Sequence, residues 1–102
     1  MPIGGDRFSF NKDNVDKSPN EHGVYALYDG DTLIYYGRAD GKNVTIRSRL
    51  QDHLAGRDGA CTKGATGYRR ETTEQAEARE IELLQEYKRA NRTLPRCNER
   101  IG

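Results

Sequence analysis

One acidic residue lies on what the sequence predicts to be the apolar face of a helix. The last predicted helix has one apolar stripe on a 3.6-residue wheel, made of Ala76, Leu83, Leu84 and Tyr87. Glu80 falls in the middle of that stripe. A carboxylate on an apolar face is unfavourable unless it binds a cation or accepts several hydrogen bonds. Glu80 is therefore either a metal ligand or a partly buried carboxylate that pairs with an arginine.

Arg49 and His53 are four residues apart on another predicted helix, so they lie together on one flank of its apolar stripe. Arginine offers a planar fork for phosphate, and a neighbouring imidazole can donate to the same group or to an attacking water. Arg47 lies on the other flank. The pair indicates either a phosphate site or an ordinary exposed Arg and His on a helix surface.

Two tyrosines, Tyr25 and Tyr35, lie on either side of a predicted turn, and the register of the hairpin decides whether they meet. A two-residue Asp-Gly loop pairs Tyr25 with Ile34 and sends the two tyrosines to opposite faces of the sheet. A three-residue loop over residues 29–31, or a bulge with the same effect, sets them on one face. Only the second register places both hydroxyls in one pocket.

The elements that must position these residues follow the order hairpin, helix, strand, helix. From hydrophobic periodicity, β-rich composition and a capping box at Thr72 and Gln75, we expect strands at 23–28, 32–37 and 68–72 and helices at 46–54 and about 72–89. This order predicts an α+β fold, a small three-stranded antiparallel sheet flanked by helices. We expect one domain over residues 23–102, preceded by an N-terminal arm or extension at 1–22.

Composition limits the class of protein. The 102 residues are 32% charged with a mean hydropathy of −1.01, which fits one small domain. No apolar run approaches the roughly 18 residues of a membrane span, and the first twenty residues contain acids where a signal peptide would be basic and then apolar. We therefore expect no membrane partner and a cytoplasmic location.

Charge is uneven along the chain although the formal net charge is only +1. Residues 1–33 hold three basic residues against six acidic ones, and the rest holds fourteen against ten. A modest basic surface in the later part suits a polyanion.

The two cysteines, Cys61 and Cys97, belong to no C-x-x-C pair, and His22 and His53 stand alone. This spacing indicates neither a disulfide framework nor a zinc site. We expect reduced thiols, as in a reducing compartment.

Taken in chain order, these residues resemble the GIY-YIG nuclease superfamily. The segments that carry the resemblance are Gly23-Val24-Tyr25, Tyr35-Tyr36-Gly37, Arg49 with His53 one turn later, Glu80, and Pro95-Arg96-Cys97-Asn98. They span most of the chain. The resemblance implies a GIY-YIG-like fold and hydrolysis of a DNA phosphodiester with one divalent metal ion.

The resemblance also implies which residues handle metal and phosphate. Glu80 would hold Mg²⁺ or Mn²⁺, with most other ligands supplied by water and phosphate. Arg49 would stabilise the charge that develops on the phosphate. We expect Arg38, Lys42 and Arg47 to contact nucleic acid.

The remaining implied roles concern the proton and the framework of the site. Tyr25 would accept the proton of an attacking water, as a phenolate favoured by nearby cations, and Tyr35 would orient the water or the phosphate. His53 would assist the proton transfer. Asn98 would hold the constellation together.

A second interpretation is a catalytically weak nucleic-acid-binding or interaction module that keeps the nuclease fold. The small net charge favours it, because non-specific affinity depends on neutralising phosphates. A nuclease of this size would draw its specificity from a protein partner, from a homodimer or from the structure of the DNA.

Overall fold

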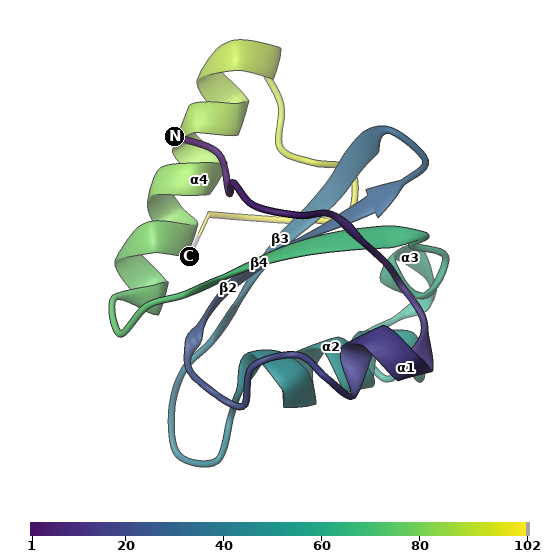
Figure 1. Ribbon diagram of the computed structural model, residues 1–102. Coiled ribbons are helices and arrows are strands. Elements are labelled where there is room, and N and C mark those ends of the chain that lie inside the picture. The colour runs from purple at the N-terminus through teal and green to yellow at the C-terminus, as the bar shows by residue number, and fades with distance from the viewer. Residues whose placement is uncertain (102) are drawn as a thin grey trace.

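Four antiparallel strands, in the order β1-β4-β2-β3, form the sheet around which the chain is built (Figure 1). The structure is a computed structural model that describes residues 1–101. The elements in chain order are β1 (Phe8–Ser9), α1 (Lys12–Val15), β2 (Gly23–Asp29), β3 (Thr32–Ala39), α2 (Ile46–Leu54), α3 (Ala60–Lys63), β4 (Gly67–Thr72) and α4 (Ala76–Asn91). The α+β class and the expected order of the main elements are confirmed.

The expectation of three strands was wrong, because the N-terminal segment adds a fourth. Phe8 pairs with Tyr68 across β1 and β4, and their rings lie 5.5 Å apart. Phe8 and Phe10 stand at alternate positions, which fits either a short edge strand or an arm, and two paired residues are too few for periodicity to decide between them. Within the same segment Ile3 and Val15 are buried on opposite faces of the sheet, so residues 1–22 contribute to both cores.

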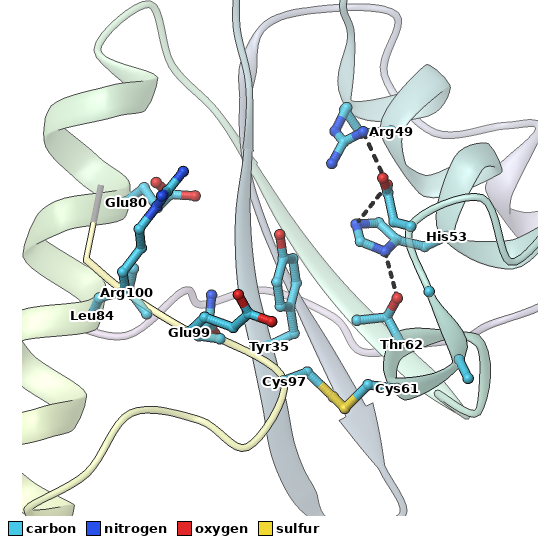
Figure 2. Close-up of a pocket in the computed structure, with 14 residues that line it drawn as sticks. Tyr35, Arg49, His53, Cys61, Thr62, Glu80, Leu84, Cys97, Glu99 and Arg100 are labelled. Carbon is cyan, nitrogen blue, oxygen red and sulfur yellow. Dashed lines mark hydrogen bonds and ion pairs between the residues drawn. A yellow bond between two sulfur atoms is a disulfide. The ribbon is translucent and has the colours of Figure 1, made fainter.

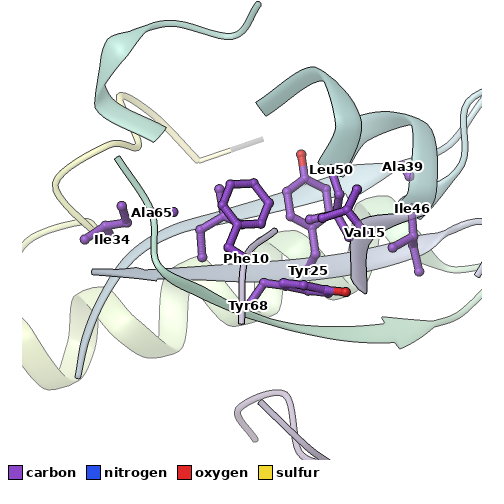
Figure 3. Close-up of a cluster of buried hydrophobic side chains, with 10 residues drawn as sticks. Phe10, Val15, Tyr25, Ile34, Ala39, Ile46, Leu50, Ala65 and Tyr68 are labelled. Atoms are coloured by element: carbon purple, nitrogen blue, oxygen red, sulfur yellow. The ribbon is translucent and has the colours of Figure 1, made fainter. Parts of the chain in front are cut away.

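Helices cover both faces of the sheet, and the alternation along β2 separates the two cores (Figure 1). Tyr25 and Leu27 point to the face covered by α1, α2 and α3, which we call the α2 face. Figure 3 shows Tyr25 there, packed beside Leu50 of α2. Val24 and Ala26 point to the face covered by α4, which we call the α4 face. β3 lies at one edge of the sheet, and the α2 face and the α4 face meet along this edge at the site described below.

The capping box forms on α2 instead of α4. Thr45 accepts a hydrogen bond from the Ser48 backbone, and the Ser48 hydroxyl bonds back to the Thr45 backbone. The box expected at Thr72 and Gln75 was wrong, because Thr72 is the last residue of β4 and Gln75 makes no side-chain cap. α2 is therefore anchored at the end that precedes Arg49.

The β2–β3 hairpin combines both of the alternatives that the sequence leaves open. Asp29 pairs with Thr32, so the loop has two residues and Gly30 takes a φ of 60°. A bulge then shifts the register: Tyr28 pairs with Leu33, whereas Leu27 pairs with Tyr35. The expectation that Tyr25 and Tyr35 share one face is confirmed, with ring centroids 6.2 Å apart.

The C-terminal tail returns along the open edge of β3 and is covalently tied there. The Cys97 backbone N–H donates to the carbonyl oxygen of Ile34 at 2.9 Å. Cys97 forms a disulfide with Cys61 of α3, with the two Cα atoms 5.8 Å apart. The expectation of reduced thiols was wrong, because the returning tail brings together two cysteines 36 residues apart in the chain.

Within residues 1–101, none of the helices is both long and apolar enough to cross a membrane.

Candidate active site

A cavity of about 520 Å³ opens beside the exposed edge of β3, between α4 on one side and α2 with α3 on the other (Figure 2). The predicted site residues that line it are Tyr35, Arg49, His53, Glu80 and Asn98. They come from β3, α2, α4 and the C-terminal tail. The structure therefore brings together five of the six predicted catalytic residues, and the sixth, Tyr25, lies directly behind them.

Tyr25 is fully buried, and its hydroxyl lies 2.7 Å from Nε2 of His53. The other ring nitrogen, Nδ1, lies 2.8 Å from the hydroxyl of Thr62, which is also buried. A neutral imidazole has one donor and one acceptor, so it satisfies both contacts when Tyr25 donates to Nε2 and Nδ1 donates to Thr62. The three side chains form a hydrogen-bonded chain from β2 to α3.

The environment holds both groups of this pair neutral. Burial lowers the pKa of His53 from 6.5 to about 4, although Asp58 acts in the opposite direction. Burial also raises the pKa of Tyr25 well above its ordinary value of 10, and Arg49 only partly opposes this effect. The phenolate expected at Tyr25 is therefore unfavourable in the free protein.

Gly37 makes room for the two tyrosines. A Cβ at this position would overlap the Tyr25 ring and would lie 2.7 Å from the Tyr35 ring. The glycine next to Tyr35-Tyr36 is thus required by the packing of the site.

Arg49 lines the cavity, with its side chain about a quarter exposed. Its Nη1 is 2.9 Å from Oδ2 of Asp58 and 3.5 Å from Oδ2 of Asp52. The guanidinium also interacts with the hydroxyls of Tyr25 and Tyr35, and it lowers the pKa of each against the effect of burial. Arg47 points elsewhere: its Nε donates to the Ser18 carbonyl oxygen at 2.8 Å.

Glu80 lies across Tyr35 from Arg49, on the inner side of α4 (Figure 2). Only 8% of the residue is exposed, and burial raises the pKa of its carboxyl group. Arg38 Nη1 lies 3.3 Å from Oε1, so Glu80 does pair with an arginine. Arg38 also contacts Glu77 and Asp40 at 3.5 and 3.6 Å, so its charge is shared among three carboxylates.

Asn98 acts on the backbone of β3 rather than on the cavity itself. Its Oδ1 accepts from the Tyr36 backbone N–H at 3.0 Å, and its Nδ2 donates to the Tyr36 carbonyl oxygen at 2.9 Å. The amide thereby fixes the strand next to Tyr35.

The three cations expected to contact nucleic acid are separated. Arg38 lines a second hollow of about 390 Å³, which shares Tyr35, Arg49 and Glu80 with the main cavity. Lys42 is exposed in the loop between β3 and α2, and neither Lys42 nor Arg47 lines either hollow. The structure joins only Arg38 to the site.

Asp58 is a charged residue of the site that sequence reasoning missed, as are Glu99 and Arg100 of the tail. It follows α2 in a turn-rich stretch with no periodicity, so no pattern in the sequence indicates where its side chain points. Its carboxylate contacts Arg49 and faces His53, which puts it among the residues with predicted roles.

Acidic and basic side chains both line the main cavity. The charged lining residues are the acids Asp58, Glu80 and Glu99 and the cations Arg49 and Arg100. No group of three His, Cys, Asp or Glu side chains within residues 1–101 could hold a metal ion by itself. A divalent ion here would depend on Glu80 together with water and phosphate oxygens.

Comparison with known proteins identifies one family. Residues 1–90 match the family described as Domain of unknown function (DUF7508), a segment that ends before Cys97 and Asn98. Neither a curated protein nor a solved structure matches the chain.

Proposed function

The chain belongs to this family of unknown function, and we propose that it acts as a GIY-YIG-like, divalent-metal-dependent endonuclease that hydrolyses DNA phosphodiester bonds. One observation carries the proposal. Tyr35, Arg49 and Glu80, from three separate elements, line one cavity, and the Tyr25–His53 pair lies directly behind it. These are the residue types that phosphodiester hydrolysis requires: a metal carboxylate, a phosphate-binding cation and a route for a proton.

Glu80 is the residue that would hold Mg²⁺ or Mn²⁺. Its largely buried carboxylate shares Arg38 with two other acids, so its charge is incompletely balanced, and a bound cation could complete the balance. When bound, the divalent ion would supply positive charge to a phosphate oxygen and lower the pKa of a water. Asp40 lines the adjoining hollow and is the neighbouring carboxylate that could share this role.

Arg49 and Tyr35 act on the phosphate. Arg49 uses one nitrogen, Nη1, for Asp52 and Asp58, and its guanidinium also interacts with the hydroxyls of Tyr25 and Tyr35, so a phosphate oxygen would take the N–H groups that remain. Tyr35 presents its hydroxyl to the cavity beside Arg49 and orients the phosphate or the attacking water.

Tyr25 accepts the water proton without becoming a phenolate beforehand. As its oxygen takes that proton, its own O–H bond breaks and a new N–H bond forms at Nε2 of His53, 2.7 Å away. Tyr25 is covered in the free protein, and Arg49 lies against its hydroxyl. Movement of Arg49 toward the phosphate uncovers the hydroxyl, which couples proton transfer to substrate binding.

The alternative function is the catalytically weak nucleic-acid-binding or interaction module. The observation that favours it is that Arg38 and Arg49 are both ion-paired within the protein, so neither charge is free to neutralise a DNA phosphate. Under either proposal a protein partner or a homodimer supplies the specificity.

We place the activity in the cytoplasm. There the Cys61–Cys97 disulfide would be exposed to cellular reductants.

Cleavage of supercoiled plasmid and of branched DNA with Mg²⁺ or Mn²⁺ tests the proposal. Glu80→Ala should abolish metal-dependent cleavage. Glu77→Ala is the matched control, because Glu77 lies one turn earlier on α4 and contacts the same Arg38 without lining the cavity. Binding without cleavage by the wild-type protein would establish the alternative function, and equal activity of the two variants would remove Glu80 from the mechanism.

A further inference from the structure

We propose that Asp58 is a positioning residue of this site, which orients Arg49 for the phosphate and stabilises the positive charge that His53 acquires during proton transfer. The inference rests on the proposed nuclease function for its role in the reaction. Its physical core, the coupling of Asp58 to Arg49 and His53, is independent of that function.

One oxygen of Asp58 faces both partners. Oδ2 lies 2.9 Å from Nη1 of Arg49 and 3.6 Å from Nε2 of His53, the nitrogen that also contacts Tyr25. The side chain is about one third exposed, and the residue lines the cavity. Asp58 is thus next to the atom on which the proton arrives.

The loop that carries Asp58 is held at both ends. Arg57 donates to Asp52 of α2 through its backbone N–H and its Nε, each at 2.9 Å. Gly56 and Gly59 take positive φ angles of 78° and 102°, a conformation that favours glycine. Three residues after Asp58, Cys61 is tied to the tail by the disulfide. Asp58 is therefore presented to the cavity on a loop with restrained ends, as a positioning role requires.

Charge balance explains why a carboxylate is needed here. The groups that face His53 are Tyr25 from β2, Tyr35 from β3, Thr62 from α3, and Arg49 and Asp52 from α2 itself. Of these, the Arg49 guanidinium lowers the pKa of His53 and so disfavours the protonated ring. Asp52 raises this pKa, but less strongly than Asp58 does. Asp58 neutralises the guanidinium and attracts the charged ring at the same time.

The test replaces Asp58 with its neutral isostere. In Asp58→Asn, the NMR titration midpoint of the His53 ring should fall by roughly one pH unit, because a nearby carboxylate stabilises the protonated ring on about that scale. Asp52→Asn is the control, since Asp52 also contacts Arg49 but shifts His53 least, and its effect should be smaller. An unchanged His53 midpoint in a folded Asp58→Asn protein would overturn the inference.

Kinetics supply the second readout. Asp58→Asn should lower kcat at least tenfold with little change in KM, and Asp58→Glu should restore part of the loss. A loss confined to KM would instead assign Asp58 to substrate binding. An NMR response of Asp58 to Mg²⁺ larger than that of Glu80 would make Asp58 a metal ligand, and it would also overturn the positioning role.

The two proposals can fail separately. A His53 midpoint that responds to Asp58→Asn as expected, in a protein whose wild type cleaves no DNA, would refute the proposed function while leaving the coupling in place.

Discussion

The two faces of the sheet present their site residues differently. On the α2 face, Tyr25, His53 and Thr62 are buried in a hydrogen-bonded chain. On the α4 face, Glu80 faces the cavity, and Arg38 only partly balances its charge. The first arrangement is complete in the free protein. The second leaves a carboxylate whose pKa is raised by burial, which is the state that a bound cation would relieve.

Acid should therefore affect the two faces in opposite directions. Protonation of His53 on the α2 face disrupts a neutral buried pair, so it opposes folding. Protonation of Glu80 on the α4 face removes a partly buried charge, so it favours folding. The contrast teaches that the α2 face holds a complete hydrogen-bonded network, whereas the α4 face keeps a buried carboxylate whose charge is only partly balanced.

The largest expected effect concerns the disulfide, which ties only the α2 face to the tail. A cross-link that closes a loop of this length, with the cysteines 36 residues apart, stabilises by about 4 kcal/mol on the chain-entropy estimate. Urea unfolding with and without a phosphine reductant should show a loss of that order. The double variant Cys61→Ser with Cys97→Ser should be equally unstable and indifferent to the reductant. Identical unfolding midpoints for oxidised and reduced wild-type protein would show that the disulfide does not stabilise the fold.

Arg49 gives the next largest effect, on catalysis rather than on stability. Arg49→Ala should lower kcat on the order of a hundredfold, because it removes a hydrogen-bond donor to the charge of the transition state. This corresponds to a rise of roughly 3 kcal/mol in the activation free energy. Arg47→Ala should mainly weaken DNA binding, since Arg47 lies outside the cavity. Steady-state kinetics and binding isotherms separate the two effects. The reverse pattern would transfer the catalytic role to Arg47.

His53 should make the protein less stable in mild acid. Burial lowers its folded-state pKa from 6.5 to about 4, so the unfolded chain binds a proton first as the pH falls. The stability is present above about pH 6.5 and is lost progressively toward pH 4. Urea unfolding across this window should show a steeper decline for the wild type than for His53→Gln. Parallel curves would mean that His53 is accessible to protons in the folded state.

Asn98→Ala should have a smaller effect on stability. Loss of the two hydrogen bonds to the Tyr36 backbone should lower the free energy of unfolding by about 1–2 kcal/mol. Asn98→Asp retains the acceptor but loses the donor, so its thermal midpoint should fall between those of Ala and wild type. An Asp variant no more stable than Ala would show that the contact to the Tyr36 N–H contributes little.

The smallest expected effect has the opposite sign. The folded-state pKa of Glu80 is raised, so ionisation of this group destabilises the fold once the pH exceeds its usual 4.5. Glu80→Gln should therefore raise the melting temperature slightly at pH 7.5 and should not raise it at pH 4. Differential scanning calorimetry measures both values. A lower melting temperature at pH 7.5 would show that the pair with Arg38 outweighs the desolvation of Glu80.

The parts of the site that follow from local periodicity could be predicted from the sequence. The position of Glu80 on the inner stripe of α4 and of Arg49 beside His53 on α2 depends only on helical spacing, and both were confirmed. The common face of Tyr25 and Tyr35 could be stated only as a condition, because a bulge in β3 leaves no mark in composition.

The remaining features depend on long-range folding. Asp58 is brought to Arg49 by a loop, the Cys61–Cys97 bond by the returning tail, and β1 by pairing with a strand nearly sixty residues later. None of these contacts involves a sequence period, so propensity and spacing alone could not indicate them.

The tail that carries Asn98 also shields the sheet from other chains. An edge strand displays unpaired N–H and C=O groups that can recruit a strand from another molecule and begin aggregation. At β3 the Ile34 and Tyr36 groups are instead occupied by Cys97 and Asn98, and at the opposite edge β1 is only two residues long. Truncation of the chain before Cys97 would therefore expose the β3 edge, and the shortened protein should self-associate through its sheet.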